Sequence, residues 1–144
     1  MEIAIIASDR KKELVTEFCL AYLGILCIHN LYATESTGKH ITEATGLNIE
    51  CMLPGSHGGV EQLTARISCN EIDLLLYFRN PLNAPQYNEA EQNLLRVCDI
   101  YNVPVATNIA TAEALILALD QGSLDWRELV NPKFQLNKGK NIHY

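Results

Sequence analysis

The sequence predicts a three-layer α/β fold with a mainly parallel sheet. Two patterns support that prediction. Short apolar runs alternate with amphipathic stretches along the 144-residue chain, which is typical of strand–helix–strand units around a parallel sheet. Ile72–Phe78 is almost continuously apolar, as expected for a central strand that is buried on both faces. Because no linker or internal repeat divides the sequence, we expect one doubly wound domain over residues 1–144, with a loose tail at 137–144.

The apolar runs predict the strands Glu2–Ala7, Cys27–Ala33, Ile49–Leu53, Ile72–Phe78 and Val103–Thr107. The stretches between them predict helices over Asp9–Leu23, from the polar turn Thr34–Gly38 to about Gly46, and over Val60–Asn70, Asn88–Asn102 and Thr111–Leu119. In the first helix, Leu14, Phe18 and Ala21 recur at helical spacing and predict its buried face. The periodicity fades from Asp120 onward.

Composition narrows the class of protein. Apolar residues make up 48% of the chain, which argues against disorder. The formal net charge is −6 and no basic stripe is present, so we expect no nucleic-acid partner. No apolar run approaches the roughly 20 residues that span a bilayer, and the N-terminus lacks the features of an export signal. We therefore expect a cytoplasmic protein without a membrane partner.

The five cysteines show no ligand spacing. They form no C-x-x-C pair and no metal-binding pattern with the histidines. The residues are Cys19, Cys27, Cys51, Cys69 and Cys98. We expect buried thiols in a reducing compartment, and neither a metal nor a cofactor.

Polar segments follow four of the predicted strands, at the ends where open parallel sheets bind ligands. These segments are Ser8–Lys12, Thr34–Gly38, Pro54–Gly59 and Arg79–Tyr87. Their convergence predicts a site for a small phosphorylated metabolite.

Hydroxyl groups in the second segment are the first candidates for anion contacts. Thr34, Ser36 and Thr37 adjoin a helix N-terminus, where free amides and the helix dipole favour negative charge. Capping of the helix by the same hydroxyls is the alternative.

Lys12 and the glycine-rich loop are the next candidates. Gly55 and Ser56 lie in a loop without bulky side chains, which lets the backbone approach a ligand, although turns also need glycine. Lys12 lies one turn into the first predicted helix, close enough to a strand end to meet an anion. A solvated surface charge is the alternative for Lys12.

In this order and spacing, the segments resemble the methylglyoxal synthase family over residues 2 to 120, with essentially no gaps. The matching segments are Ala7–Asp9 with Lys12, Leu31–Gly38, Ala44–Asn48, Met52–Gly59, Pro81–Ala84 and Asn102–Ala112. The resemblance implies a flavodoxin-like fold and a homohexamer, without a cofactor or metal. It also implies conversion of dihydroxyacetone phosphate to methylglyoxal and phosphate, in which a carboxylate removes a proton beside the carbonyl and the resulting enediolate expels phosphate.

The phosphate-contacting positions of the family carry over, by this resemblance, to Lys12, Thr34, Ser36, Thr37 and Gly55. Asp9 matches one of its site acids, and Pro54 replaces a residue that is usually serine.

The reactive end departs from the family. Val60 stands where the resemblance implies the base, and Asn80 and Ala90 stand at two further acidic positions. Tyr87 replaces a histidine. Loss of a catalytic base costs several powers of ten in rate, whereas a preorganised binding site can survive. The first hypothesis is therefore a protein that binds a small phosphate ester, such as dihydroxyacetone phosphate, with little synthase activity.

Three residues offer a rearranged catalytic site, which is the alternative hypothesis of an active synthase. Glu61 follows Val60 and has a longer side chain, but it also suits the first turn of a helix, where it complements the dipole. His57 offers an imidazole, or simply an exposed loop side chain. Asp9 offers a carboxylate, or alternatively a helix cap or a hydrogen bond to loop amides. A regulatory or assembly module that acts through oligomer contacts is the third hypothesis.

Overall fold

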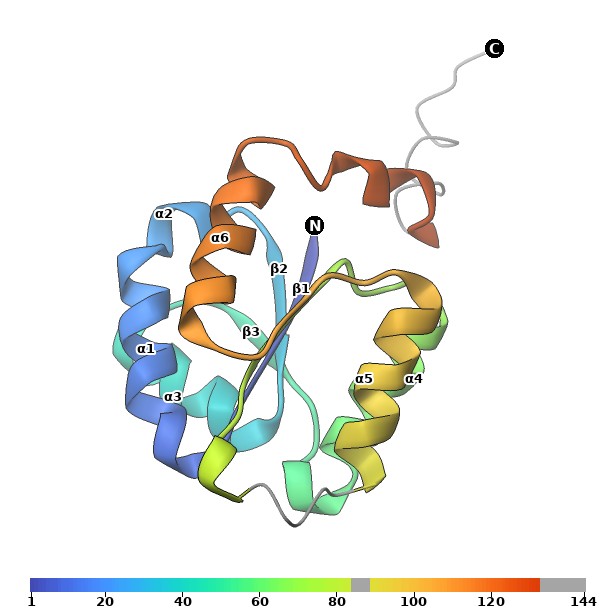
Figure 1. The fold of residues 1–144 in the computed structure, drawn as a ribbon. Helices are drawn as coiled ribbons and strands as arrows, with labels where there is room; N and C mark the ends of the chain where they lie inside the picture. The colour runs from blue at the N-terminus through green and yellow to red at the C-terminus, as the bar shows by residue number, and fades with distance from the viewer. Residues whose placement is uncertain (84–88, 133–144) are drawn as a thin grey trace.

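The computed structural model describes residues 1–83 and 89–132, which form a five-stranded parallel sheet between two layers of helices (Figure 1). The strands are β1 (Glu2–Ala7), β2 (Asn30–Ala33), β3 (Ile49–Cys51), β4 (Leu74–Phe78) and β5 (Val105–Ala106). They lie in the order β3-β2-β1-β4-β5, and all neighbours are parallel. The predicted three-layer α/β fold is confirmed. The tail expected at 137–144 lies outside the described residues.

The helices divide between the two faces of the sheet. They are α1 (Lys12–Ala21), α2 (Leu23–Leu26), α3 (Glu35–Thr45), α4 (Gly59–Ser68), α5 (Glu89–Tyr101) and α6 (Ile109–Asp120), with short 3₁₀ turns η1 (Asp9–Lys11), η2 (Gly55–His57), η3 (Pro81–Asn83) and η4 (Asp125–Leu129). One apolar cluster joins α1, α3 and α6 to the sheet, and a second joins α4 and α5 to its other face (Figure 1).

The position of β1 determines where a ligand can bind. All six of its residues are buried, because β2 and β4 flank it and helices cover both faces. The chain runs outward from β1 to β2 and β3, and then returns to β4 on the other side of β1. The carboxyl ends of β1 and β4 are therefore a topological switch point, where open α/β sheets bind ligands.

Two predicted boundaries are wrong near the first connection. The strand expected at Cys27–Ala33 begins only at Asn30, because Leu23–Leu26 is helical and the Cys27 amide still donates to the Leu23 carbonyl at 3.0 Å. The helix expected at Asp9–Leu23 starts as a 3₁₀ turn, and α1 itself begins at Lys12. Its buried residues are Val15, Phe18 and Cys19, so Phe18 is buried as predicted, whereas Ala21 is exposed.

The stretch after α6, which shows no periodicity, is nevertheless held in place at the amino-terminal edge of the sheet. Arg127 of η4 is completely buried, and its Nε lies 3.3 Å from Asp73 Oδ1. Its two terminal nitrogens donate to the carbonyl oxygens of Ile72 at 2.9 Å and Tyr101 at 3.1 Å. Asn131 Nδ2 lies 3.0 Å from both Asp73 carboxylate oxygens. These polar contacts, together with Leu124 in the apolar core, fix this segment.

The expectation of buried cysteines holds for two residues. Burial raises the pKa of both the Cys19 and the Cys98 thiol to about 12. Cys27, Cys51 and Cys69 are exposed, which corrects the prediction. Cys51 is exposed because β3 is an edge strand.

In the described part of the chain, no helix combines the length and the apolarity needed to cross a membrane. Within the same residues, no three metal-ligating side chains come together.

Candidate functional site

The predicted anion site is built around Thr37, where β1 and β2 end. Lys12 Nζ lies 2.7 Å from Thr37 Oγ1 and 2.6 Å from the carbonyl oxygen of Ala7. Thr37 Oγ1 also accepts from the Ala7 amide at 3.3 Å, and Thr37 is completely buried. An ammonium group has three N–H donors, so Lys12 keeps one donor for a ligand. We call Lys12, Thr34, Thr37 and Gly55 the cradle.

Thr34 belongs to this network instead of capping α3. It occupies the N-cap position, but its side chain makes no capping hydrogen bond. Its Oγ1 lies 3.3 Å from Thr37 Oγ1, and the residue is buried. The first turn of α3, which contains exposed Ser36, therefore has amides for which the helix supplies no acceptor. Those amides and the helix dipole favour an anion beside Lys12.

Gly55 and Val60 form the opposite wall. A side-chain carbon at position 55 would have as nearest neighbours Thr34 Cγ2 and Val60 Cγ2, each at 3.9 Å. Val60 is only 7% exposed, so it presents an apolar, desolvated surface beside the cradle. The approach of this loop depends on Gly59, where any side chain would overlap the carbonyl oxygen of Leu53.

Asp9 begins η1, three residues before Lys12 of the cradle. Burial lowers the pKa of the Lys12 ammonium, and the charge of the Asp9 carboxylate partly opposes this effect. Asp9 is exposed. Its side chain makes no hydrogen bond with residues 1–83 or 89–132 and caps neither η1 nor α1. The capping and loop-binding alternatives for Asp9 are therefore not seen.

The other two catalytic candidates are exposed. Glu61 is exposed, and it follows Val60 on α4, where successive side chains are rotated by about 100°. His57 is also exposed, and its Nδ1 lies 2.8 Å from Ser56 Oγ. The structure thus places Ser56 and His57 in contact with each other on the outer side of η2.

Two buried polar atoms at the switch point have no hydrogen-bond partner among the described residues: Ser8 Oγ and Asn80 Nδ2. Ser8 follows β1 directly and its amide donates to the Phe78 carbonyl at 2.9 Å. Asn80 follows β4, and its Oδ1 accepts from the Leu82 amide at 3.1 Å. Ser8 lies in the polar segment Ser8–Lys12 that the sequence places at the site, but the sequence analysis gives it no role of its own; its place directly after a buried strand is the signal that could have found it.

Comparisons of the sequence with a family model and with known proteins point to the same family. The family model described as "MGS-like domain" matches residues 17–107. Methylglyoxal synthase of Caldicellulosiruptor saccharolyticus is 54% identical over 138 residues, which cover 96% of this chain and 98% of that protein. The enzyme of Thermoanaerobacter pseudethanolicus is 50% identical over 129 residues, which cover 90% and 98%.

The chain belongs to the methylglyoxal synthase family. The crystal structure of methylglyoxal synthase from Elizabethkingia anophelis supports the fold, with 34% identity, a TM-score of 0.73 and coverage of 80% of this chain and 76% of that one.

The family resemblance implies a catalytic base at position 60, but this chain has Val60 there, an apolar side chain. Val60 lines the cradle, and Asn80 brings a buried amide donor where an acid is expected. Ala90 lies in the first turn of α5, and Tyr87 lies outside the described residues. Of the candidate carboxylates Asp9 and Glu61, Asp9 is the one whose charge acts on Lys12.

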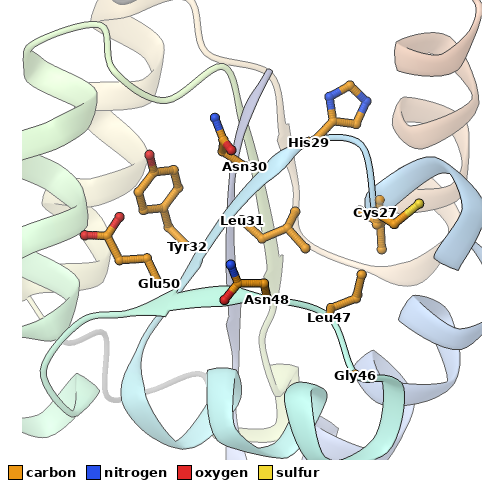
Figure 2. Close-up of a pocket in the computed structure, with 10 residues that line it drawn as sticks. Cys27, His29, Asn30, Leu31, Tyr32, Gly46, Leu47, Asn48 and Glu50 are labelled. Atoms are coloured by element: carbon orange, nitrogen blue, oxygen red, sulfur yellow. The ribbon is translucent and has the colours of Figure 1, made fainter.

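A cavity of about 580 Å³ lies away from the cradle, at the beginnings of β2 and β3 (Figure 2). Its lining includes Glu50 but no lysine or arginine. His29 also lines it, but its Nδ1 lies 2.8 Å from the Met1 ammonium nitrogen, and burial lowers its pKa. Without a stable positive charge this cavity does not suit a phosphate, so the cradle remains the site that does.

Proposed function

We propose that this protein binds a small phosphate ester of the size of dihydroxyacetone phosphate and converts it to methylglyoxal and phosphate. The observation that carries this proposal is the cradle, in which buried Thr37 aims the Lys12 ammonium at the first turn of α3. The sequence identity of 50–54% to proteins named methylglyoxal synthase supports the same reaction.

In the proposed reaction, Asp9 takes a proton from the carbon beside the substrate carbonyl. The electron pair of that bond forms an enediolate, and collapse of the enediolate breaks the bond between carbon and the phosphate oxygen. Phosphate leaves with the electron pair of the broken bond, and the remaining enol aldehyde becomes methylglyoxal when its hydroxyl loses a proton and its terminal carbon gains one. Ser8 Oγ and Asn80 Nδ2 are donors without a described partner, and they stabilise the negative oxygen that develops. Lys12 and the amides of α3 bind the phosphate, first as an ester and then as the leaving group.

A second candidate function is binding without turnover, and Val60 favours it. A valine cannot accept a proton, and Val60 is buried beside the position of Gly55, where it presents an apolar side chain in place of the missing carboxylate. If Asp9 does not reach the reacting carbon, the cradle holds the ester and the reaction does not proceed.

One experiment separates the two candidates. Purified wild type, Asp9→Asn and Val60→Asp proteins are incubated with dihydroxyacetone phosphate, methylglyoxal is quantified, and binding is measured by calorimetry. We expect wild-type turnover that falls by about 100-fold or more in Asp9→Asn. Glu13→Gln, which removes another exposed carboxylate of α1, is the matched control and should keep the wild-type rate.

The other outcomes are equally informative. A silent wild type that still binds the ester, together with activity in Val60→Asp, would establish binding without turnover. Turnover that survives in Asp9→Asn but disappears in Glu61→Gln would move the base to Glu61. Failure to bind the ester at millimolar concentration would contradict both candidate functions.

From the family resemblance we also propose a homohexamer, which sedimentation velocity tests directly. A monomer at micromolar concentration would contradict it.

A further inference from the structure

A second cavity of about 270 Å³ lies between α1 and α6, at the carboxyl ends of β4 and β5. Its apolar lining comes from both helices and from the strand end. The lining residues include Leu14, Phe78, Pro81 and Ile109. The remaining lining is polar and contains Lys11 and Arg79, but no carboxylate.

The two cations of this cavity are unpaired within the described part of the chain. Neither the Lys11 nor the Arg79 side chain makes an ion pair or a hydrogen bond with residues 1–83 or 89–132. By contrast, Lys39, Arg66 and Arg127 each pair with a carboxylate. In a chain with a net charge of −6, two unpaired positive groups on one small cavity form a local anion-attracting field.

The N-terminus of α6 adds to this field. Asn108 caps the 12-residue helix by accepting from the Thr111 amide at 3.1 Å. The amides of Ile109 and Ala110 stand at the first two positions, where the helix supplies no acceptor. Because Asn108 and Ile109 both line the cavity, the positive end of the helix dipole adjoins it.

Two lysines that are consecutive in the sequence belong to different sites, Lys12 to the cradle and Lys11 to this cavity. Lys12 Nζ bonds to Thr37 at the start of α3, whereas Lys11 lines the cavity with Ile109 at the start of α6. The backbone of η1 therefore lies between two positively charged sites that share no lining residue.

We infer that this cavity is a second anion site, which binds a phosphate monoester that carries a small apolar group. A phosphate monoester near neutral pH carries close to two negative charges, which match the two unpaired cations. The apolar wall then covers the organic group, which inorganic phosphate lacks.

The test uses phenyl phosphate as the probe and follows the backbone amides by NMR during titration. We expect shifts at Thr107–Thr111 that saturate independently of those at Thr34–Thr37. Lys11→Gln and Arg79→Gln should each weaken the Thr107–Thr111 response by about tenfold or more, because each removes a charge-assisted contact. Arg96→Gln, which removes an exposed charge on α5, should leave it unchanged.

Three comparisons complete the design. Lys12→Met should weaken the response of Thr34–Thr37 by about tenfold or more and preserve that of Thr107–Thr111, which separates this inference from the proposed function. Benzoate, with one charge, and inorganic phosphate, without an apolar group, should each bind the cavity more weakly than phenyl phosphate. Absence of shifts at Thr107–Thr111 at millimolar probe, or shifts unaffected in both Lys11→Gln and Arg79→Gln, would overturn the inference.

Discussion

Replacing Arg127 by alanine should lower the free energy of unfolding by about 3–5 kcal/mol, because it leaves a buried carboxylate without its counter-charge. The Arg127 side chain is 0% exposed and that of Asp73 is 4% exposed, so water cannot take the place of the guanidinium. The carbonyl oxygens of Ile72 and Tyr101 lose their donors at the same time. Equilibrium denaturation in urea measures the change.

Two controls separate the loss of a buried charge partner from the loss of a side chain. Glu35→Gln breaks the pair with Lys39, whose side chains are 38% and 66% exposed, and should cost less than about 1 kcal/mol. The double variant Asp73→Leu/Arg127→Met should be more stable than Arg127→Ala, because it removes both charges. A cost for Arg127→Ala as small as that of Glu35→Gln would show that the buried network does not stabilise the fold.

Replacing Lys12 by methionine should weaken phosphate-ester binding by about 10- to 100-fold, because the ligand loses a charge-assisted hydrogen bond in a partly buried site. Lys12 Nζ is held by Thr37 and Ala7 before any ligand arrives, so little order must be created on binding. Calorimetry with dihydroxyacetone phosphate measures the change. Lys39→Met, on an exposed position of α3, is the matched control, and an equal loss in both variants would contradict a specific role for Lys12.

The same lysine gives the affinity a pH dependence of known sign. Burial lowers the pKa of Lys12, so its ammonium loses the proton at a lower pH than an ordinary lysine. Ligand affinity should fall as pH rises through this lowered pKa, and Lys12→Arg should move the fall to higher pH. The free energy of unfolding without ligand should change in the opposite direction. Between the lowered pKa of folded Lys12 and the ordinary lysine pKa, the unfolded chain binds more protons than the folded one, so stability rises with pH. Binding and unfolding titrations over the alkaline range measure the two trends.

The fold could be predicted from sequence because its signals are local. A continuous apolar run identifies β4, and polar residues directly after strands identify the edge at which Lys12 and Thr37 meet. The contact between Arg127 and Asp73 spans 54 residues and joins polar side chains, so it leaves no periodic trace in the sequence.

The roles of Thr34 and Glu61 could not be assigned from sequence for a different reason. Threonine is a good helix cap, and only the geometry shows that Thr34 bonds to Thr37 instead. The direction of Glu61 depends on where α4 begins, and a start at Gly59 turns Val60 inward. If α4 began one residue later, the residue that follows its first position would be Glu61 in place of Val60, so the sequence alone does not say which of the two side chains faces inward.

The edge position of β3 has a consequence for the unliganded protein. Its three residues pair only with β2, and the chain beyond it leads to Gly55. Such a short, one-sided strand opens more easily than the rest of a sheet, and an open edge can pair with the strands of other chains. A ligand that touches both Lys12 and Gly55 binds only when this edge is closed. The ligand therefore favours the state in which β3 stays paired with β2, and its loss gives the edge of β2 more chance to be uncovered.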